Sequence, residues 1–217
     1  MKIEIWSDIA CPWCYIGKAR FDKALAEYEH ADAVEVSWRS FQLQPDAPRE
    51  NPVLTASHLA EKYGVGLSEA HEMMARASQV AADEGLEFHL DKALAANTFD
   101  AHRLVHFAAG KGELGKEMMT RLMRAYQSEG ANVADHETLL KLAVEVGLDG
   151  TEVSQMLGSD AFAAEVRADF ARGRAFGVSG VPFFVIDERH GISGAQPSEL
   201  FLRALRQLGP QPQPTAG

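Results

Sequence analysis

The sequence predicts an α/β protein in which an all-helical insertion divides the sheet-forming part of the chain. Alternation of apolar and polar residues, typical of strands, occurs near both ends, whereas helical patterns fill the long stretch between them. A proline-rich stretch, QPDAPRENP at 44–52, marks the first boundary of this insertion. The chain has 217 residues, 46% of them apolar and 24% charged, which is the balance of an ordinary globular protein.

The N-terminal residues predict a strand, a helix and a second strand. KIEIWSD at 2–8 alternates and is rich in β-branched and aromatic residues, which favours a strand. From Pro12 onward apolar residues recur at helical spacing, and proline is favoured in the first turn of a helix. AVEVSWRSFQL at 33–43 alternates again. A strand–helix–strand unit of this length suggests that the two strands pair in parallel.

Helices dominate from the boundary loop to the last quarter of the chain. Each expected helix has a polar residue that can cap its N-terminus or a glycine that can end it. The expected helices are 69–85 capped by Ser68, 99–110 capped by Thr98, 113–130, 136–147 capped by Asp135, a short turn before Gly158, and 160–177 capped by Ser159.

Strand patterns return near the C-terminus. VPFFVID at 181–187 predicts a strand, HGISGAQ at 190–196 a short partner strand, and the amphipathic segment from Pro197 a last helix. We therefore expect one α/β domain formed by 1–43 and 161–209, a helical insertion domain at 44–160, and a flexible tail at 210–217.

The charge of the chain is concentrated in the insertion. Residues 44–160 carry 10 basic and 19 acidic side chains, and the whole chain has a formal net charge of −10. Such a surface repels phosphate groups, so nucleic-acid and membrane partners are disfavoured. No run reaches the roughly 18 apolar residues of a membrane span, and the N-terminus lacks the pattern of a secretory signal. We expect a cytoplasmic protein, where thiols stay reduced and a static disulfide is disfavoured.

The two cysteines, Cys11 and Cys14, stand three positions apart in SDIACPWCYIG, between a predicted strand and a predicted helix. A structural zinc site needs four ligands, and a second Cys-x-x-Cys pair is missing. His102 and His106 share a helix face, but the metal-free interpretation is two helix-surface histidines. A cysteine at a helix start has its thiolate stabilised by free backbone N–H groups, so Cys11 fits a nucleophile and Cys14 a resolving thiol. Packing of both cysteines as small apolar residues is the remaining alternative.

The second element of interest is GVSGVPFF at 177–184. Pro182 cannot donate to a sheet ladder, so it is either an ordinary edge-strand proline or a cis-proline. In the cis form it would turn the strand end toward the cysteines and leave the backbone of Val181 free to pair with an extended substrate. The residues alone leave both alternatives open.

Together these motifs resemble the DsbA family of thioredoxin-fold oxidoreductases. CPWC after the first strand, a helical insertion after the second, and GVSGVPFFVID before the third carry the resemblance. NTFDAHRL at 97–104 and ISGAQP at 192–197 resemble segments of its FrnE-like subgroup, whose members are often described as polyketide-biosynthesis dithiol–disulfide isomerases. The neighbouring branch contains the kappa-class glutathione transferases and the 2-hydroxychromene-2-carboxylate isomerases.

The resemblance implies a DsbA-like thioredoxin fold, with 44–160 forming a helical cap beside the active site. It implies Cys11 as nucleophile, Cys14 as resolving thiol, and Pro182 in cis, packed against the pair. The residues expected to contact substrate are Pro12, Trp13, Val181, Pro182, Asn97, His102 and Arg103. For the last three, an ordinary helix N-terminus with a core histidine is the alternative.

Three functions follow as hypotheses. The leading one is a thiol–disulfide oxidoreductase or isomerase acting on protein or small-molecule disulfides, without a resident metal or cofactor. Glutathione or a thioredoxin-type system would recycle it, and the protein would be a monomer or a homodimer. The alternative is a glutathione-dependent isomerase or transferase for a small aromatic substrate, using Trp13, Tyr15, Phe183 and Phe184. A third is a redox-inert binding module with a methionine-containing cap, although core packing is the preferred interpretation of those methionines.

Overall fold

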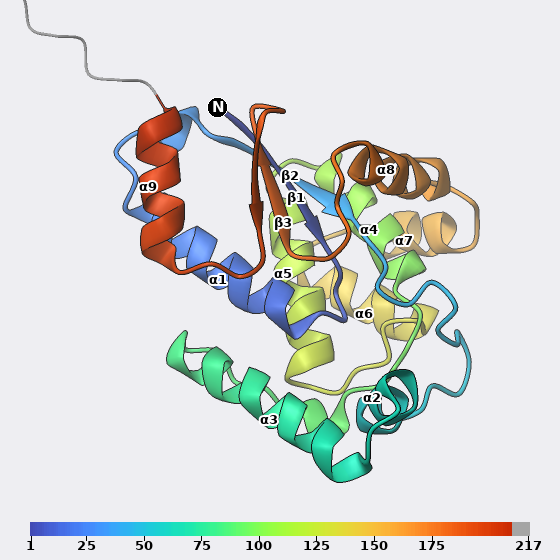
Figure 1. Ribbon diagram of the computed structural model, residues 1–217. Coiled ribbons are helices and arrows are strands. Elements are labelled where there is room, and N and C mark those ends of the chain that lie inside the picture. Colours follow the sequence, from blue (N-terminus) through green and yellow to red (C-terminus); the bar gives the residue numbers. More distant parts are fainter. Residues whose placement is uncertain (210–217) are drawn as a thin grey trace, which may run out of the picture.

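A four-stranded sheet forms the centre of the α/β part (Figure 1). The structure is a computed structural model that describes residues 1–209, so the predicted tail at 210–217 lies outside the described residues. The strands are β1 (Lys2–Ser7), β2 (Glu35–Ser40), β3 (Phe183–Ile186) and β4 (His190–Ser193), in the order β2-β1-β3-β4. β1 pairs in parallel with β2 and antiparallel with β3, which pairs antiparallel with β4. The predicted strands and the parallel pair are confirmed.

Alternation along β1 assigns each side chain to one face of the sheet. Ile3 and Ile5 point toward a cluster with α1 (Pro12–Ala26) and α9 (Ser198–Leu208), which cover one face. Trp6 points to the opposite face, where it packs beside α8 (Ala163–Ala175) and its Nε1 donates to the carbonyl of Asp169 at 2.9 Å. Helices therefore lie on both faces of the sheet, and the predicted thioredoxin-like α/β fold with an all-helical insertion is confirmed.

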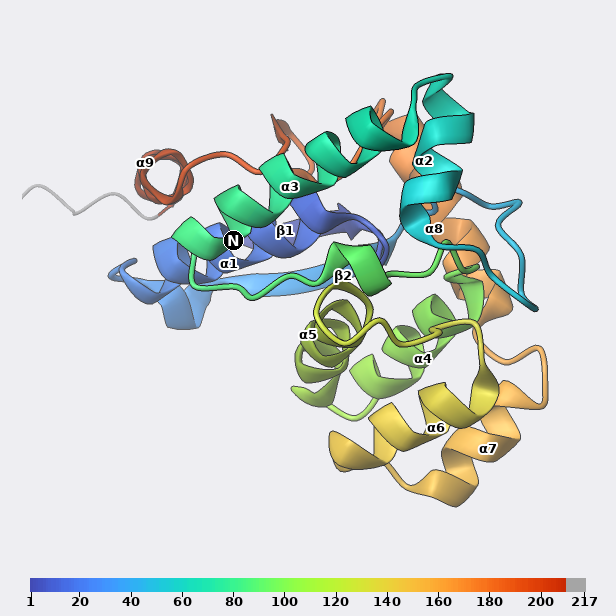
Figure 2. The same ribbon diagram turned by 90° about the horizontal axis from the view of Figure 1, so that it is seen from below.

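Most of the remaining helices belong to the insertion and form one core with the cysteine region. They are α2 (Thr55–Tyr63), α3 (Leu67–Asp83), α4 (Phe99–Ala109), α5 (Leu114–Gln127), α6 (His136–Glu145) and α7 (Gly150–Leu157), with a short 3-10 helix at Leu90–Lys92. A second 3-10 helix, Ala31–Ala33, precedes β2. Figure 2 shows α3 running beside α1, while α4 to α7 lie beyond β2. Met74, Met118, Met119 and Met123 are buried in the shared core, as the packing interpretation expects. Met73 is half-buried.

Two predicted helix caps are wrong. The first insertion helix to be predicted, α3, begins at Leu67 with Gly66 as N-cap, so Ser68 lies inside its first turn. Ser159 does not cap α8, which begins at Ala163. The intervening Phe162 takes a left-handed φ of 62°, and the hydroxyl of Ser159 donates to the carbonyl of Met156 instead.

Helix α2 was not predicted, whereas the capping role of Asp135 is confirmed. α2 has nine residues and its N-cap is Leu54, so the sequence has no polar capping residue to mark its start. Asp135 accepts a hydrogen bond from the backbone N–H of Thr138 at 2.8 Å. No helix among residues 1–209 is long and apolar enough to cross a membrane. The division into 1–43 with 161–209 and 44–160 stays a prediction.

Candidate active site

Cys11 lies where the chain passes from β1 into α1. It is the N-cap residue of α1, with extended backbone angles (φ −87°, ψ 113°), and Pro12 follows in the first turn. The first turn contains no acidic residue, and the Cys11 side chain makes no capping bond. Unpaired N–H groups and the positive end of the helix dipole therefore favour negative charge at this sulfur. Only 3% of Cys11 is exposed, so a disulfide must reach it through a confined opening.

Cys14 lies one turn further along α1 and is 1% exposed. Its backbone N–H donates to the carbonyl of Cys11 at 3.1 Å, and both cysteines are free thiols. Burial raises the pKa of the Cys14 thiol well above its ordinary value, and contact with Cys11 raises it further. The Ser7 hydroxyl and the Asp8 backbone act in the opposite direction. Cys14 is therefore a buried thiol behind the more accessible Cys11.

The loop before β3 completes this side of the site. The Val181–Pro182 peptide bond is cis, as the resemblance implies. The Cys11 thiol donates to the carbonyl of Val181 at 3.6 Å. The edge-strand alternative for Pro182 is wrong, because β3 has neighbours on both sides. Pro182 packs so closely on α1 that a Cβ atom at Gly17 would lie 2.9 Å from its Cγ.

A cavity of about 190 Å³ opens beside Cys11. Its wall comes from the start of α1, the loop after β2, and helices α2, α3 and α5. The lining residues are Ala10, Cys11, Pro12, Trp13, Leu43, Gln44, Thr55, Leu59, Lys62, Tyr63, Met73, Met74, Ala77, Leu90, Tyr126 and Gln127. Trp13 and Tyr63 are 42% and 55% exposed. Lys62 is the one Lys, Arg, Asp or Glu side chain in this described wall.

Tyr126 supplies a hydroxyl to the inner wall of the cavity. Burial raises the pKa of Tyr126 to about 12, and the nearby negative charges of Asp8 and Cys11 act in the same direction. The hydroxyls of Tyr126 and Thr55 lie 3.3 Å apart. Tyr126 therefore remains a protonated hydrogen-bond donor at physiological pH.

His102 supports the loop that leads to Cys11. It is fully buried, so the helix-surface interpretation of this histidine is wrong. Its Nε2 lies 3.4 Å from Oδ1 of Asp8, which is also buried. Asp8 accepts a hydrogen bond from the backbone N–H of Leu43, and its carbonyl accepts one from Cys11. His102 thus lies behind the cysteine loop and not in the cavity wall.

Asn97 and Arg103 hold loops rather than line the cavity. The side-chain amide of Asn97 donates to the carbonyls of Pro45 and Ala47, and its oxygen accepts from Phe99 at the start of α4. The Arg103 guanidinium pairs with Asp100 and donates to the carbonyls of Met156, near the end of α7, and Ala161, which precedes α8. A role for either in substrate binding stays a prediction.

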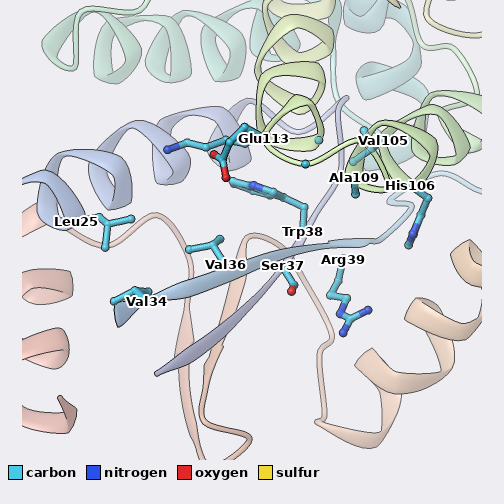
Figure 3. A pocket seen from close by; sticks show the side chains of 13 residues that line it. Leu25, Val34, Val36, Ser37, Trp38, Arg39, Val105, His106, Ala109 and Glu113 are labelled. Atoms are coloured by element: carbon cyan, nitrogen blue, oxygen red, sulfur yellow. The ribbon is translucent and has the colours of Figure 1, made fainter. Parts of the chain in front are cut away.

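A larger cavity, of about 400 Å³, lies at the free edge of β2 (Figure 3). The Trp38 side chain extends from β2 toward Glu113 there, and His106 and Arg39 lie at the other end. Neither cysteine lines it, so the smaller cavity is the candidate active site. Within residues 1–209, no cluster of three or more His, Cys, Asp or Glu side chains is placed to hold a metal ion.

The residues that the insertion contributes to the wall of the Cys11 cavity were not predicted from the sequence. Thr55 and Lys62 lie on the unpredicted α2, and Tyr126 and Gln127 end α5. No local motif distinguishes these residues from others on their helices. Asp8 did have a signal, since it stands three residues before Cys11.

Three features of this structure occur together: a Cys-x-x-Cys pair at a helix start, a cis-proline loop that contacts it, and a sheet with an all-helical insertion. Together they define the thioredoxin-fold class of redox proteins with a DsbA-type helical cap. The family model of the DSBA-like thioredoxin domain matches residues 2–206, and the chain belongs to this family. Membership supports an oxidoreductase or isomerase role.

The chain is similar to several known proteins over nearly its whole length. The chain is 29% identical over 217 residues to an uncharacterised protein, YwbO, of Bacillus subtilis (strain 168), covering 94% of this chain and 96% of that one. A crystal structure of a probable DsbA oxidoreductase, SCO1869 from Streptomyces coelicolor, is 42% identical with a TM-score of 0.91, covering 100% of this chain and 94% of that one. The cytosolic disulfide reductase DsbM from Pseudomonas aeruginosa is 21% identical, with a TM-score of 0.69 and coverage of 96% and 98%, which shows the fold.

Proposed function

We propose that the protein is a thiol–disulfide oxidoreductase whose two cysteines undergo thiol–disulfide exchange with a disulfide substrate. The observation that carries this proposal is the position of Cys11, which is the N-cap of α1, contacts the Val181 carbonyl and lines a cavity, with Cys14 buried one turn behind it. This arrangement separates an attacking sulfur from a resolving sulfur.

The reaction takes place in two exchanges. The Cys11 thiolate attacks one sulfur of the substrate disulfide, and the other sulfur leaves as a thiolate and takes up a proton. Cys14 then loses its proton and attacks the Cys11 sulfur, which breaks the mixed disulfide and releases the second substrate thiol. The substrate gains two electrons, and the protein ends with a Cys11–Cys14 disulfide. A small thiol such as glutathione, or a thioredoxin-type dithiol protein, returns two electrons to it.

Substitution of each cysteine tests these roles. Cys11→Ser should abolish insulin reduction, because the attacking sulfur is lost. Cys14→Ser should accumulate a mixed disulfide on Cys11, detectable as a mass increase that disappears with a reductant. Insulin reduction by Cys11→Ser at the wild-type rate would refute the proposal.

The reduction potential of the cysteine pair decides the direction of the reaction. A value near roughly −270 mV, like that of thioredoxin, would define a reductant, and a value toward roughly −120 mV, like that of DsbA, an oxidant or isomerase. We place the reaction in the cytoplasm, because DsbM from Pseudomonas aeruginosa, a protein of this fold, is a cytosolic disulfide reductase.

A glutathione-dependent isomerase or transferase for a small aromatic substrate is the second candidate. It is favoured by the mostly apolar cavity wall, in which Trp13, Tyr63 and Met73 lie near the opening and Lys62 could pair with a carboxylate. A protein of this fold, DsbM, has been crystallised with GSH. Under this candidate Cys14→Ser keeps most of its activity, and glutathione binds saturably without forming a disulfide.

A further inference from the structure

Ser7 carries a buried hydroxyl without a partner on the α1 side of the sheet. It is the last residue of β1 and is fully buried. Ile3 and Ile5, which share its side of the strand by alternation, pack against α1, so the Ser7 side chain points to the same face. Its backbone is fixed in the sheet, because its carbonyl accepts from the backbone N–H of Phe41 at 3.1 Å. Among residues 1–209, its hydroxyl oxygen has no hydrogen-bond partner while both cysteines are thiols.

The Cys14 thiol is the group on α1 that this hydroxyl faces. Burial raises the pKa of Cys14 most and contact with Cys11 raises it further, whereas hydrogen bonding from the Ser7 side chain lowers it. A neutral thiol is a weak acceptor, but a thiolate is a strong one. The Ser7 hydroxyl therefore gains a full hydrogen-bond partner only when the Cys14 sulfur carries negative charge.

The second exchange of the proposed reaction requires negative charge on this shielded sulfur. Cys14 must lose its proton to attack the Cys11 sulfur, and that proton ends on the substrate sulfur that leaves Cys11. Cys14 is 1% exposed, so water does not solvate the charge, and an unpaired buried charge is costly. The step therefore needs hydrogen-bond donors at Cys14. The Ser7 hydroxyl supplies one from a side chain, and the Asp8 backbone supplies another.

We propose that Ser7 is a catalytic residue whose hydroxyl donates to the Cys14 sulfur while that sulfur carries negative charge. This inference rests on the proposed disulfide exchange and assigns a donor to its second step. In the reverse direction Cys14 is the leaving group, so the same hydrogen bond assists opening of the Cys11–Cys14 disulfide. Because Cys14 is uncharged in both the dithiol and the disulfide, the hydroxyl speeds both directions and leaves the equilibrium between them unchanged.

The test follows the two exchanges separately. Reduced protein is mixed with glutathione disulfide and quenched with acid, and mass spectrometry measures the glutathione mixed disulfide on Cys11 and the Cys11–Cys14 disulfide. In Ser7→Ala the rate constant of the first exchange should stay within about twofold, and that of the second should fall about tenfold, so the mixed disulfide accumulates. Opening of the oxidised protein by reduced glutathione should slow by the same factor, with the equilibrium constant unchanged.

Ser40→Ala is the matched control. Ser40 pairs with Ser7 across the two parallel strands and is 3% exposed, but its hydroxyl lies 3.2 Å from Nε2 of His106. Its removal should change neither exchange. Ser7→Thr keeps a hydroxyl at the same position, so its second exchange should be faster than that of Ser7→Ala.

The result for each step decides between a catalytic and a structural role. A second exchange at the wild-type rate in Ser7→Ala would overturn the inference. Equal losses in both exchanges, or a changed equilibrium constant, would also overturn it and leave Ser7 only a structural role. If the reduced wild-type protein forms neither the mixed disulfide nor the Cys11–Cys14 disulfide, the proposed function itself fails.

Discussion

Asp169 joins the sheet to the helical insertion, and its charge should be a measurable part of the stability of the protein. The residue lies on α8 and is 3% exposed. Its carboxylate accepts hydrogen bonds from the backbone N–H of Ser40 at 2.9 Å, from His106 at 2.9 Å and from Arg39 at 3.1 Å. Ser40 ends β2 and His106 lies on α4, so one carboxylate connects three elements.

The expected cost of Asp169→Asn follows from these partners. Removal of one member of a buried ion pair typically costs about 3–5 kcal/mol. Asparagine keeps the shape and one acceptor oxygen, and Arg39 is 30% exposed and keeps its ion pair with Glu4. We therefore expect a loss of about 2–3 kcal/mol at neutral pH, or roughly 5–10 °C in Tm for a chain of this size.

The stability lost in Asp169→Asn should depend on pH, and the pKa of Asp169 determines in which direction. Burial alone would raise the pKa of Asp169, but the bonds from His106 and Ser40 and the charge of Arg39 outweigh it and hold the pKa below its usual value. A carboxyl with a lowered pKa in the folded protein stabilises it above the unfolded value of about 3.9. That stability is lost as the pH falls through the folded-state pKa. The difference between wild type and variant should therefore shrink on acidification.

Urea denaturation at pH 7 and at successively lower pH measures both quantities. Asp160→Asn, which removes an exposed carboxylate, is the control and should change stability by less than about 0.5 kcal/mol. A loss for Asp169→Asn that is equally small at pH 7, or one that is the same at pH 3 as at pH 7, would refute the reasoning.

Four further substitutions separate the support of the site from the stability of the fold. Gly17→Ala gains up to about 1 kcal/mol of helix propensity and places a Cβ 2.9 Å from Pro182, so the disulfide-exchange rate should fall while stability changes by less than about 2 kcal/mol. Gly115→Ala, whose Cβ would lie 2.8 Å from the backbone of α4, should instead lower the urea midpoint and leave the disulfide-exchange rate unchanged. A lowered exchange rate in this variant would show that the effect of Gly17→Ala is not specific to the site. Trp13→Ala removes a half-exposed ring at the cavity opening and should raise KM for a peptide disulfide several-fold with little effect on Tm, whereas an unchanged KM would place the substrate elsewhere. Arg103→Lys cannot keep the contacts of the guanidinium with one carboxylate and several carbonyls, so a loss of about 2–4 kcal/mol is expected, and wild-type stability would contradict it.

The reactive side of the site could be predicted because its parts have local sequence signals. Cys11 and Cys14 stand at a strand-to-helix junction, and Pro12 marks the helix start two residues before Cys14. Pro182 follows a glycine-rich stretch directly before a strand. Each of these signals depends on a few adjacent residues, so it can be recognised in the sequence without knowledge of the fold.

The cavity wall could not be predicted, because it depends on how distant helices pack. Tyr126 and Gln127 lie more than a hundred positions after Cys11, and nothing in RAYQSEG marks them as neighbours of a thiol. Thr55 begins a helix of nine residues whose N-cap is Leu54, so no polar capping residue marks its start in the sequence. The predicted caps at Ser68 and Ser159 are wrong for a related reason. Both serines fit the local pattern of a capping residue, but the helices begin after Gly66 and Phe162.

The two parts of the chain therefore contribute different properties to the site. The first strand and helix, with the loop before β3, supply the sulfur atoms and their immediate contacts. Apart from that segment and the loop after β2, the described wall of the Cys11 cavity is built by the insertion, including its hydroxyls, its amide and Lys62. The net charge of −9 in residues 44–160 lies mostly outside this wall. Substitutions in the insertion can consequently change which disulfide enters without changing the thiol chemistry that follows.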